Sequence, residues 1–372
     1  MKKVLAFMLA AMMMASMAVG CGNDGSTSSA DGGAADNTAS TESTDGEEPA
    51  EEPAADASDV SIGSCVYKFD DTFMTGVRNT MTARAAELGA TIDIVDSQNK
   101  QPTQNEQVDT FITKGVNALI VNPVDLTAAG PIITKAKDAG LPIVLQNRQP
   151  SEEDMNSYDQ AWYVGCKAEQ SGTMSGEIIA DYFTANPDAD KNGDGTIQYV
   201  MLQGEPGHQD ATLRSEYAPK AIEEAGFKVE QLAADTAMWD KVKATDLMAA
   251  FISSQSLDKI EAVLCNNDDM ALGAIEALKA EGYNSGDASK YIPVVGVDAT
   301  APALEAMKEG SLLGTVLNDA TSQGNASVNI AVAAAQGKEV TEENIGYPVT
   351  DDKYVWIDYV KVTQDNYQDY IS

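Results

Sequence analysis

The chain has 372 residues, of which 58 are Asp or Glu and 24 are Lys or Arg, so its formal net charge is −34. This surplus of negative charge excludes nucleic acid as a partner, because binding to a phosphate backbone needs clustered Lys and Arg. The single histidine and the four cysteines exclude a histidine-rich metal centre and a disulfide-rich scaffold. The length and the 43% hydrophobic content predict about two globular domains.

Residues 1–20 have the layout of a secretory signal peptide. A short basic start (Lys2 and Lys3) is followed by an apolar run too short for a comfortable membrane span, and then by small residues. The four residues that end at Cys21 are similar to a lipobox, in which cleavage leaves Cys21 as the lipidated N-terminus. An ordinary signal peptide without lipidation is the alternative, because Ala18 stands at a position where lipoboxes usually carry Leu. We expect an extracytoplasmic protein, lipid-anchored to the cell membrane at the cell surface or in the periplasm.

Residues 21–59 are rich in Ser, Thr, Gly, Ala, Pro and acids, and they contain no Lys, Arg or aromatic residue. A segment of this composition cannot bury enough apolar surface to offset the entropy of ordering, so we expect an acidic, disordered tether. The remaining Val60–Ser372 still carries 47 acidic against 22 basic side chains. The folded part is therefore acidic in its own right.

From Val60 onward, short β-rich runs alternate with stretches whose apolar positions recur at helical spacing. The predicted strands are Ser61–Phe69, Thr91–Val95, Ala118–Val121, Pro142–Leu145, Trp162–Val164, Ile197–Leu202, Val229–Leu232, Ala262–Cys265, Pro293–Val297 and Leu312–Leu317. The predicted helices are Phe73–Leu88, Thr103–Lys114, Thr127–Ala139, Glu169–Phe183, Ala211–Glu224, Lys241–Ser253, Asp269–Ala280, Ala301–Lys308 and Ser322–Ala335. The alternation predicts an α/β fold of two doubly wound parallel-sheet lobes, with ligands bound at the carboxyl ends of the strands.

Asn and Asp recur directly after the predicted strands, together with one Arg, one His and isolated aromatic residues. Carboxylates and side-chain amides offer the acceptors and donors that vicinal hydroxyls need, and flat rings cover the C–H faces of a pyranose. The pattern favours a neutral polyol ring as ligand. Helix capping is the alternative for any single position, since Asp and Asn are common N-caps. The close spacing of His208, Asp210 and Arg214, with aromatic rings at Phe73 and Trp239, is harder to explain by capping alone.

Five longer motifs carry a resemblance to a known family. They are Tyr67–Met74 (YKFDDTFM), Gly204–Asp210 (GEPGHQD), Asp235–Asp240 (DTAMWD), Asn266–Met270 (NNDDM) and Gly314–Ala320 (GTVLNDA). With them the chain resembles the periplasmic galactose/glucose-binding proteins of ABC sugar-transport and chemotaxis systems, in the type I periplasmic binding protein family. The resemblance implies ten sugar-binding residues, namely Asp71, Phe73, Asn147, His208, Asp210, Arg214, Trp239, Asn267, Asp298 and Asn318. It implies further that Asp71 contacts the O4 hydroxyl and that Phe73 and Trp239 sandwich the sugar.

The resemblance also implies a function. It predicts a monomeric, non-enzymatic receptor that closes on D-galactose or D-glucose and delivers the hexose to the membrane subunits of an ABC permease. The expected segments are an N-terminal lobe at 60–164 plus 320–356, a C-terminal lobe at 165–319 plus 357–372, and hinge crossings near 164–167, 317–320 and 356–360. A sensory receptor that presents the sugar to a chemoreceptor or a membrane kinase is one alternative. A secreted glycosidase with Asp210 and Asp298 as its carboxylate pair is another.

The segment Asp190–Gln198 (DKNGDGTIQ) fits the first nine positions of an EF-hand loop, with Gly195 at the sixth. The predicted ligands are Asp190, Asn192, Asp194, Thr196 through its carbonyl, and Gln198. The twelfth position is Met201 rather than Glu. An ordinary surface turn is therefore an alternative interpretation of the local sequence. The resemblance implies that Glu261 supplies the missing carboxylate and that the loop binds a structural Ca²⁺.

Three further cysteines, Cys65, Cys166 and Cys265, lie in or beside predicted strands. Their spacing matches no metal-binding or redox motif. We expect them to be small buried hydrophobic residues.

Overall fold

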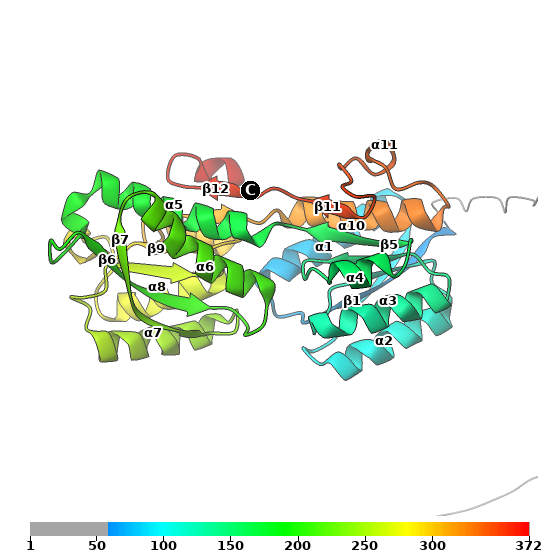
Figure 1. The fold of residues 1–372 in the computed structure, drawn as a ribbon, viewed down its shortest axis with the longest axis horizontal. Helices are drawn as coiled ribbons and strands as arrows, with labels where there is room; N and C mark the ends of the chain where they lie inside the picture. The colour runs from blue at the N-terminus through cyan, green and yellow to red at the C-terminus, as the bar shows by residue number, and fades with distance from the viewer. Residues whose placement is uncertain (1–58, 372) are drawn as a thin grey trace, which may run out of the picture. The chain divides into compact units, whose positions relative to one another are not determined.

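The computed structural model describes residues 59–371 (Figure 1). The predicted signal peptide, Cys21 and all of the predicted tether except Asp59 lie outside the described residues. Among residues 59–371, no helix combines the length and the hydrophobicity that crossing a bilayer requires.

Five strands from the first half of the described chain, together with β11 from near its end, build a six-stranded sheet in the order β11-β5-β4-β3-β1-β2, with every neighbouring pair parallel. Its strands are β1 (Ser61–Val66), β2 (Thr91–Asp96), β3 (Ala118–Val121), β4 (Ile143–Gln146), β5 (Ala161–Gly165) and β11 (Tyr354–Trp356). Its helices are α1 (Thr72–Glu87), α2 (Gln101–Lys114), α3 (Ala129–Asp138), α4 (Glu152–Asn156) and α10 (Ala320–Ala335). Apolar side chains of α1 and α10 cover one face, and those of α2, α3 and α4 cover the other. We call this part the six-stranded lobe.

The second part contains a four-stranded sheet in the order β7-β6-β8-β9, again entirely parallel. Its strands are β6 (Thr196–Gln203), β7 (Lys228–Thr236), β8 (Ala262–Cys265) and β9 (Val294–Val295). Its helices are α5 (Ala168–Ala185), α6 (Gln209–Glu224), α7 (Lys241–Gln255), α8 (Asp268–Ala280) and α9 (Ala301–Lys308). Helices α5 and α6 bury one face of the sheet, and α7, α8 and α9 bury the other. We call this part the four-stranded lobe.

Strand β10 (Thr315–Leu317) continues the four-stranded lobe through single bridges from Val295 and Asp298, and it pairs antiparallel with β12 (Val360–Val362). The chain therefore passes between the lobes three times: after β5, between β10 and α10, and between β11 and β12. These crossings lie where hinge segments are expected. The α/β fold of two doubly wound sheets is confirmed, and the exact domain boundaries stay a prediction.

Several details differ from the expectations. The first strand ends at Val66 rather than Phe69, because Asp71 caps α1 and the residues between form a loop. A 3₁₀ turn at Leu126–Ala128 precedes α3, so the helix expected from Thr127 begins at Ala129. Strands β9 and β10 are shorter than expected, and the antiparallel pairing of β12 was not expected. The short elements α4, α11 (Glu342–Ile345), β11 and β12 were missed, because so few residues carry too little periodicity.

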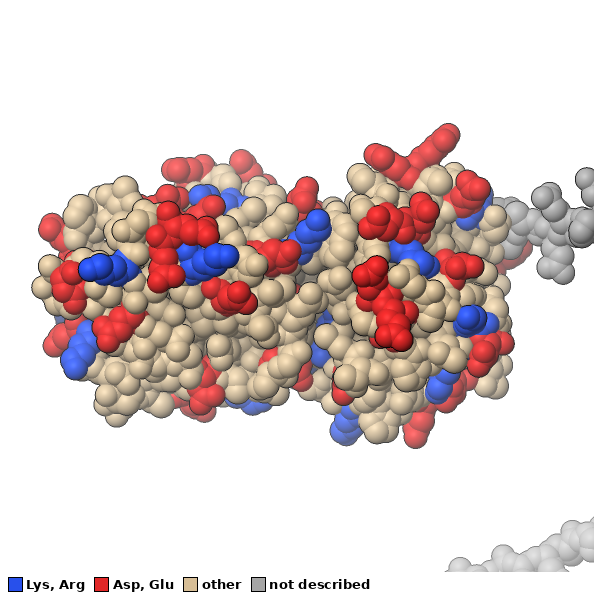
Figure 2. Space-filling model, viewed as in Figure 1, with Lys and Arg blue, Asp and Glu red and all other residues tan. Residues whose placement is uncertain are grey.

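Figure 2 shows that acidic side chains are scattered over the visible face of both lobes, with Lys and Arg between them. Most ion pairs among the described residues join neighbours within one lobe and lie in water. Such pairs contribute little to stability. The acidic surplus is therefore a general property of this surface.

Candidate functional site

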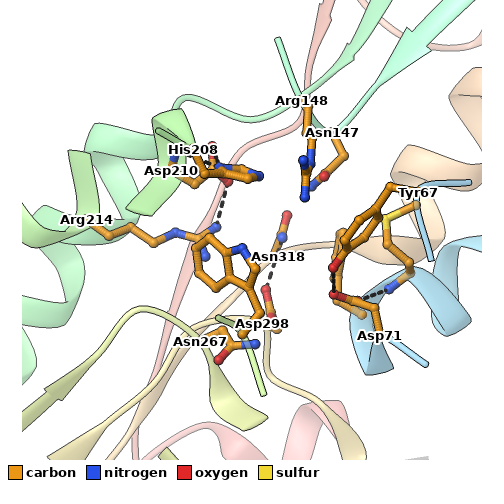
Figure 3. A pocket seen from close by; sticks show the side chains of 13 residues that line it. Tyr67, Asp71, Asn147, Arg148, His208, Asp210, Arg214, Asn267, Asp298 and Asn318 are labelled. Carbon is orange, nitrogen blue, oxygen red and sulfur yellow. Dashed lines mark hydrogen bonds and ion pairs between the residues drawn. The ribbon is translucent and has the colours of Figure 1, made fainter. Parts of the chain in front are cut away.

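All ten predicted site residues line one pocket at the carboxyl ends of the strands of both sheets (Figure 3). The six-stranded lobe contributes Asp71 and Phe73 at the start of α1, and Asn147 directly after β4. The four-stranded lobe contributes His208, Asp210, Arg214, Trp239, Asn267, Asp298 and Asn318, which follow β6, β7, β8, β9 and β10. Tyr67, Met74 and Arg148 line the pocket as well and were not among the predicted residues. The sequence signal that could have identified these three residues is that they lie close to Asp71 or Asn147 in the chain.

Helix capping and pocket lining coincide at three of these positions. Asp71, His208 and Asn267 are the N-caps of α1, α6 and α8, and the side chain of each accepts a backbone N–H of its own helix. Asn147 and Asp298 cap no helix. Helix capping, the alternative that the sequence left open, therefore applies to only some of the pocket residues. A residue that caps a helix can also line the binding pocket.

Three of the pocket residues have backbone conformations that residues other than Gly rarely adopt. The φ angles are 63° at Asn147, 60° at Trp239 and 126° at Asp298. Each such residue costs roughly 1–3 kcal/mol and persists only where the surroundings hold it, which is common at ligand sites. At Asn147, the hydroxyl of Tyr163 donates to the backbone carbonyl at 2.9 Å, and the amide of Asn122 donates to Oδ1 at 3.2 Å.

Arg214 is the best-anchored cation of the pocket. Its guanidinium donates to Asp210 Oδ2 at 3.1 Å, to the Tyr359 hydroxyl at 2.9 Å and to the Asn266 carbonyl at 2.8 Å. Burial raises the pKa of Asp210, although the charges of Arg214 and Arg148 oppose this shift. Asp210 and Arg214 therefore form a rigid pair of one acceptor and one donor, because charge-assisted hydrogen bonds hold both side chains in place.

His208 presents a neutral donor. Its Nδ1 accepts the backbone N–H of Asp210 at 3.1 Å, which leaves Nε2 to carry the proton. Burial, and next the charges of Arg148 and Arg214, lower the pKa of His208 well below its usual value, so the ring is uncharged at neutral pH. A neutral N–H of this kind suits an oxygen of an uncharged ligand.

Asp298, Asn318 and Asn267 are the remaining polar groups that the four-stranded lobe contributes. Asn318 Nδ2 donates to Asp298 Oδ1 at 3.1 Å, and Asn318 Oδ1 accepts from Gln323 Nε2 at 2.6 Å. Asn267 Oδ1 accepts the N–H of Met270 at 3.0 Å, so its amide N–H₂ remains available to a ligand. Burial raises the pKa of Asp298 well above its usual value, and the charge of Arg214 opposes this shift.

On the opposite side, Asp71 is oriented by its own lobe. Its Oδ1 accepts the N–H of Met74 at 2.7 Å, and its Oδ2 accepts the hydroxyl of Tyr67. The guanidinium of Arg148 stacks 4.3 Å from the centre of the Tyr67 ring and donates to Glu205 Oε2 at 2.7 Å. Because Glu205 belongs to the four-stranded lobe, this ion pair connects the two lobes at the pocket.

Two aromatic rings supply the apolar surface. Phe73 comes from the six-stranded lobe and Trp239 from the four-stranded lobe, and both are buried. Gly204 leaves room for the indole, because a Cβ there would lie 2.1 Å from the Trp239 ring. The ring centres of Trp239 and His208 are 5.1 Å apart in an edge-to-face arrangement. Flat apolar rings beside amides and carboxylates can bind the C–H faces and the hydroxyls of one small polyol.

The predicted calcium loop has the turns of an EF-hand loop. Asp190 accepts the N–H groups of Gly193 at 2.7 Å and Gly195 at 2.8 Å, and Gly195 has a φ of 73°. The carboxylate of Glu261 accepts the N–H of Lys191 at 2.6 Å and of Gln198 at 3.1 Å, and so lies against both ends of the loop. Within residues 59–371, no three Asp, Glu, His or Cys side chains gather closely enough to hold a metal by themselves. The loop supplies amide and carbonyl oxygens in addition, and this donor set fits Ca²⁺.

The cysteines are all free thiols in the described part of the chain. Cys65 and Cys265 are buried in β1 and β8, as expected. Cys166, which lies after β5, packs against the apolar cores of both lobes but is only partly buried. Its thiol donates to Asn318 Oδ1 and accepts from Gln323 Nε2, both at 3.3 Å, so it acts as a polar group behind the pocket.

Comparison with known proteins agrees with this architecture. A family model described as a periplasmic binding protein domain matches residues 62–339. The D-galactose/methyl-galactoside binding periplasmic protein MglB of Haemophilus influenzae is 44% identical over 320 residues, which cover 86% of this chain and 94% of that protein. A xylitol-binding protein of Mycolicibacterium smegmatis is 30% identical and covers 78% of this chain and 77% of its own length. The structure of an ABC transporter solute binding protein from Bacillus halodurans with bound myo-inositol matches with a TM-score of 0.70 at 35% identity, over 84% of this chain and 97% of that one.

Proposed function

Because the chain belongs to the periplasmic binding protein domain family, we propose that it is an extracytoplasmic receptor that closes on D-galactose or D-glucose and delivers the hexose to an ABC permease. The observation that carries the proposal is the pocket itself. Ten polar and aromatic residues from both lobes converge there, and they include one neutral imidazole, one anchored guanidinium and two flat rings. Closure of the lobes around the ligand would replace water at each hydroxyl with a fixed partner.

The chemistry of the pocket favours an uncharged sugar. Asp71, Asp210 and Asp298 accept hydroxyl protons, while Arg214 and His208 donate to hydroxyl or ring oxygens. Each carboxylate that faces the pocket already has a protein donor, so a ligand has to satisfy only the remaining lone pairs. A hexose lacking one hydroxyl would leave a buried partner unpaired, which costs about 1–3 kcal/mol.

The choice of hexose follows from the relatives and from the resemblance of the motifs. MglB of Haemophilus influenzae is named for D-galactose and methyl-galactoside, whereas other relatives are named for xylitol or hold myo-inositol. Isothermal titration with D-galactose, D-glucose, D-allose, D-xylose, xylitol and myo-inositol tests the proposal directly. Nanomolar to micromolar binding of D-galactose, D-glucose or both would support the proposal. If only myo-inositol or xylitol binds, that polyol would take the place of the hexose as the proposed ligand. Small-angle scattering should show compaction on saturation.

We propose that the receptor binds its sugar without turnover. A glycosidase needs two carboxyl groups that flank a glycosidic oxygen, one of them free to give up a proton. Here Asp210 is paired with Arg214, and Asp298 accepts a hydrogen bond from Asn318, in a pocket lined by residues of both lobes. Steady release of nitrophenol from aryl galactosides or glucosides by the purified protein would contradict this part of the proposal.

We propose that residues 190–198 and Glu261 hold a structural Ca²⁺. The ion would be bound by the side chains of Asp190, Asn192, Asp194, Gln198 and Glu261 and by the carbonyl of Thr196, and would rigidify the start of β6. The support is the EF-hand pattern of turns and the position of Glu261, which is buried against both ends of the loop. The site lies far along β6 from the sugar pocket, which suits a structural role.

For the cellular context we propose lipidation at Cys21, an acidic tether over residues 21–59 and a monomeric receptor domain. Mass spectrometry of the membrane-extracted protein, before and after Cys21→Ala, tests the anchor. Loss of sugar uptake on deletion of the gene would identify the permease role. Co-purification with a chemoreceptor or a sensor kinase, with uptake intact, would instead favour the sensory alternative.

A further inference from the structure

We infer that Asp268, a residue outside the pocket, positions Asp298 for the ligand through the hydrogen bonds of its buried side chain. The inference rests on the proposed function and adds a positioning residue to its binding site. Asp268 has no exposed surface and does not line the pocket. It directly follows Asn267 at the start of α8, and its backbone N–H donates to the Val297 carbonyl at 2.8 Å.

The side chain of Asp268 ties together the segment that carries Asp298. Its Oδ2 accepts the backbone N–H of Thr300 at 2.8 Å and the hydroxyl of Thr300 at 3.2 Å. Its Oδ1 accepts the hydroxyl of Thr315 at 2.6 Å. The same Thr315 oxygen accepts the N–H of Ala299 at 3.3 Å. Both residues after Asp298 are therefore held by one carboxyl group and one hydroxyl.

This restraint acts where the backbone is strained. Ala299 has a φ of 53°, in the left-handed region that L-residues other than Asn and Asp seldom adopt, and Asp298 has a φ of 126°, which lies outside even that region. Such conformations persist only where neighbouring groups over-determine them. The space for Asp268 is itself provided by a glycine, because a Cβ at Gly296 would lie 2.3 Å from its Oδ1. Residues 296–300, the first turn of α8 and β10 thus meet at one buried side chain.

The consequence for binding is geometric. If the carboxyl group of Asp268 is removed, the turn at 298–300 loses its restraint and Asp298 can relax away from the pocket. Hydrogen-bonding groups need to be held within a few tenths of an ångström of their productive position. We therefore expect Asp268→Ala to weaken binding of the hexose about 10-fold, a loss typical of one buried hydrogen bond to a charged group.

Substitutions at Asp268 and Thr315 separate positioning from general stability. Asp268→Asn should bind within about 3-fold of wild type, because the amide still accepts from Thr300 and can donate to Thr315. Thr315→Val removes only the hydroxyl and should weaken binding several-fold. The matched control is Asn284→Ala, which removes another buried side chain of the same lobe with positive φ (49°) that bonds Ile292 and Ser311. The control should lower the melting temperature and leave the dissociation constant unchanged.

The experiment is titration of D-galactose and D-glucose into the wild type and these variants, with melting curves for each. Combining Asp268→Ala with Asp298→Asn should weaken binding by less than the product of the single effects, since both act at one group. A folded Asp268→Ala protein with wild-type affinity, or Asp268→Asn as damaging as Asp268→Ala, would overturn the inference. If Asp268→Ala does not fold, the affinity of the Thr315→Val variant for the hexose tests the inference in its place. Wild-type protein that binds neither hexose would instead overturn the proposed function.

Discussion

The ion pair of Arg148 and Glu205 is, among residues 59–371, the single salt bridge that joins the two lobes, so opening of the lobes must break it. Its nitrogen and oxygen are 2.7 Å apart, and its side chains are 5% and 20% exposed. Arg148 lines the sugar pocket, and both residues line a second hollow immediately outside it. The pair therefore lies beside the pocket, and we expect it to stabilise only the form in which the lobes are in contact.

Its magnitude follows from this burial. Exposed pairs contribute about 0.2–1 kcal/mol, whereas removing one partner of a buried pair costs about 3–5 kcal/mol. For this partly shielded pair we expect about 1.5–2 kcal/mol for Glu205→Gln, which weakens hexose binding roughly 10- to 30-fold. The loss should fall on the closed form, because both charges are solvated when the lobes separate.

The assay is isothermal titration of the preferred hexose into wild type and Glu205→Gln at about 20 mM and about 500 mM NaCl, concentrations that bracket the range over which salt screens exposed charges. Wild-type affinity should decrease at high salt, and the variant should lose most of this dependence. The control is Glu305→Gln, which breaks the 3.0 Å pair with Lys308 inside α9, where both side chains are more than half exposed. Equal affinity and equal salt dependence in wild type and Glu205→Gln would refute the reasoning.

Three further outcomes are expected. Asp210→Ala should abolish measurable hexose binding with little change in circular dichroism, because it leaves Arg214 partly unpaired in the pocket; near-normal affinity in titration would contradict its role. A chelator should lower the melting temperature of the wild type but not of Glu261→Gln, and an unchanged wild-type melting curve would remove the calcium proposal. Burial, opposed by bonds from Thr315 and Thr300, raises the pKa of Asp268 to about 7. With this raised pKa, the folded state binds more protons than the unfolded state. The melting temperature of the sugar-free protein should therefore rise as the pH falls from about 8 to about 5. Asp268→Asn should show a smaller gain, and equal pH dependence in both proteins would contradict the shift.

The sequence predicted the main sheets and the pocket because both depend on local patterns. Parallel strands buried on both faces appear as short apolar runs, and ligand residues follow the strands, since the carboxyl ends of parallel strands share one edge. The structure places Asn147, Asp298 and Asn318 at that edge, although they are far apart in the chain. Strand β11 escaped prediction because its pairing with the distant β5 defines it, and helix α4 because five residues carry too little periodicity.

What the sequence could not predict is the layer of residues that holds the ligand-facing groups. Tyr67 orients Asp71 through its hydroxyl, and Arg148 reaches from the end of β4 to the other lobe. Neither role has a local pattern, because each depends on which side chains the crossings of the chain bring together. The same limit applies to Asp268, whose sequence context is that of an acidic residue in the first turn of a helix. Its burial against Thr300 and Thr315 is visible only once three separate segments are in place, and there a carboxyl group that would ordinarily face water becomes a restraint on the site.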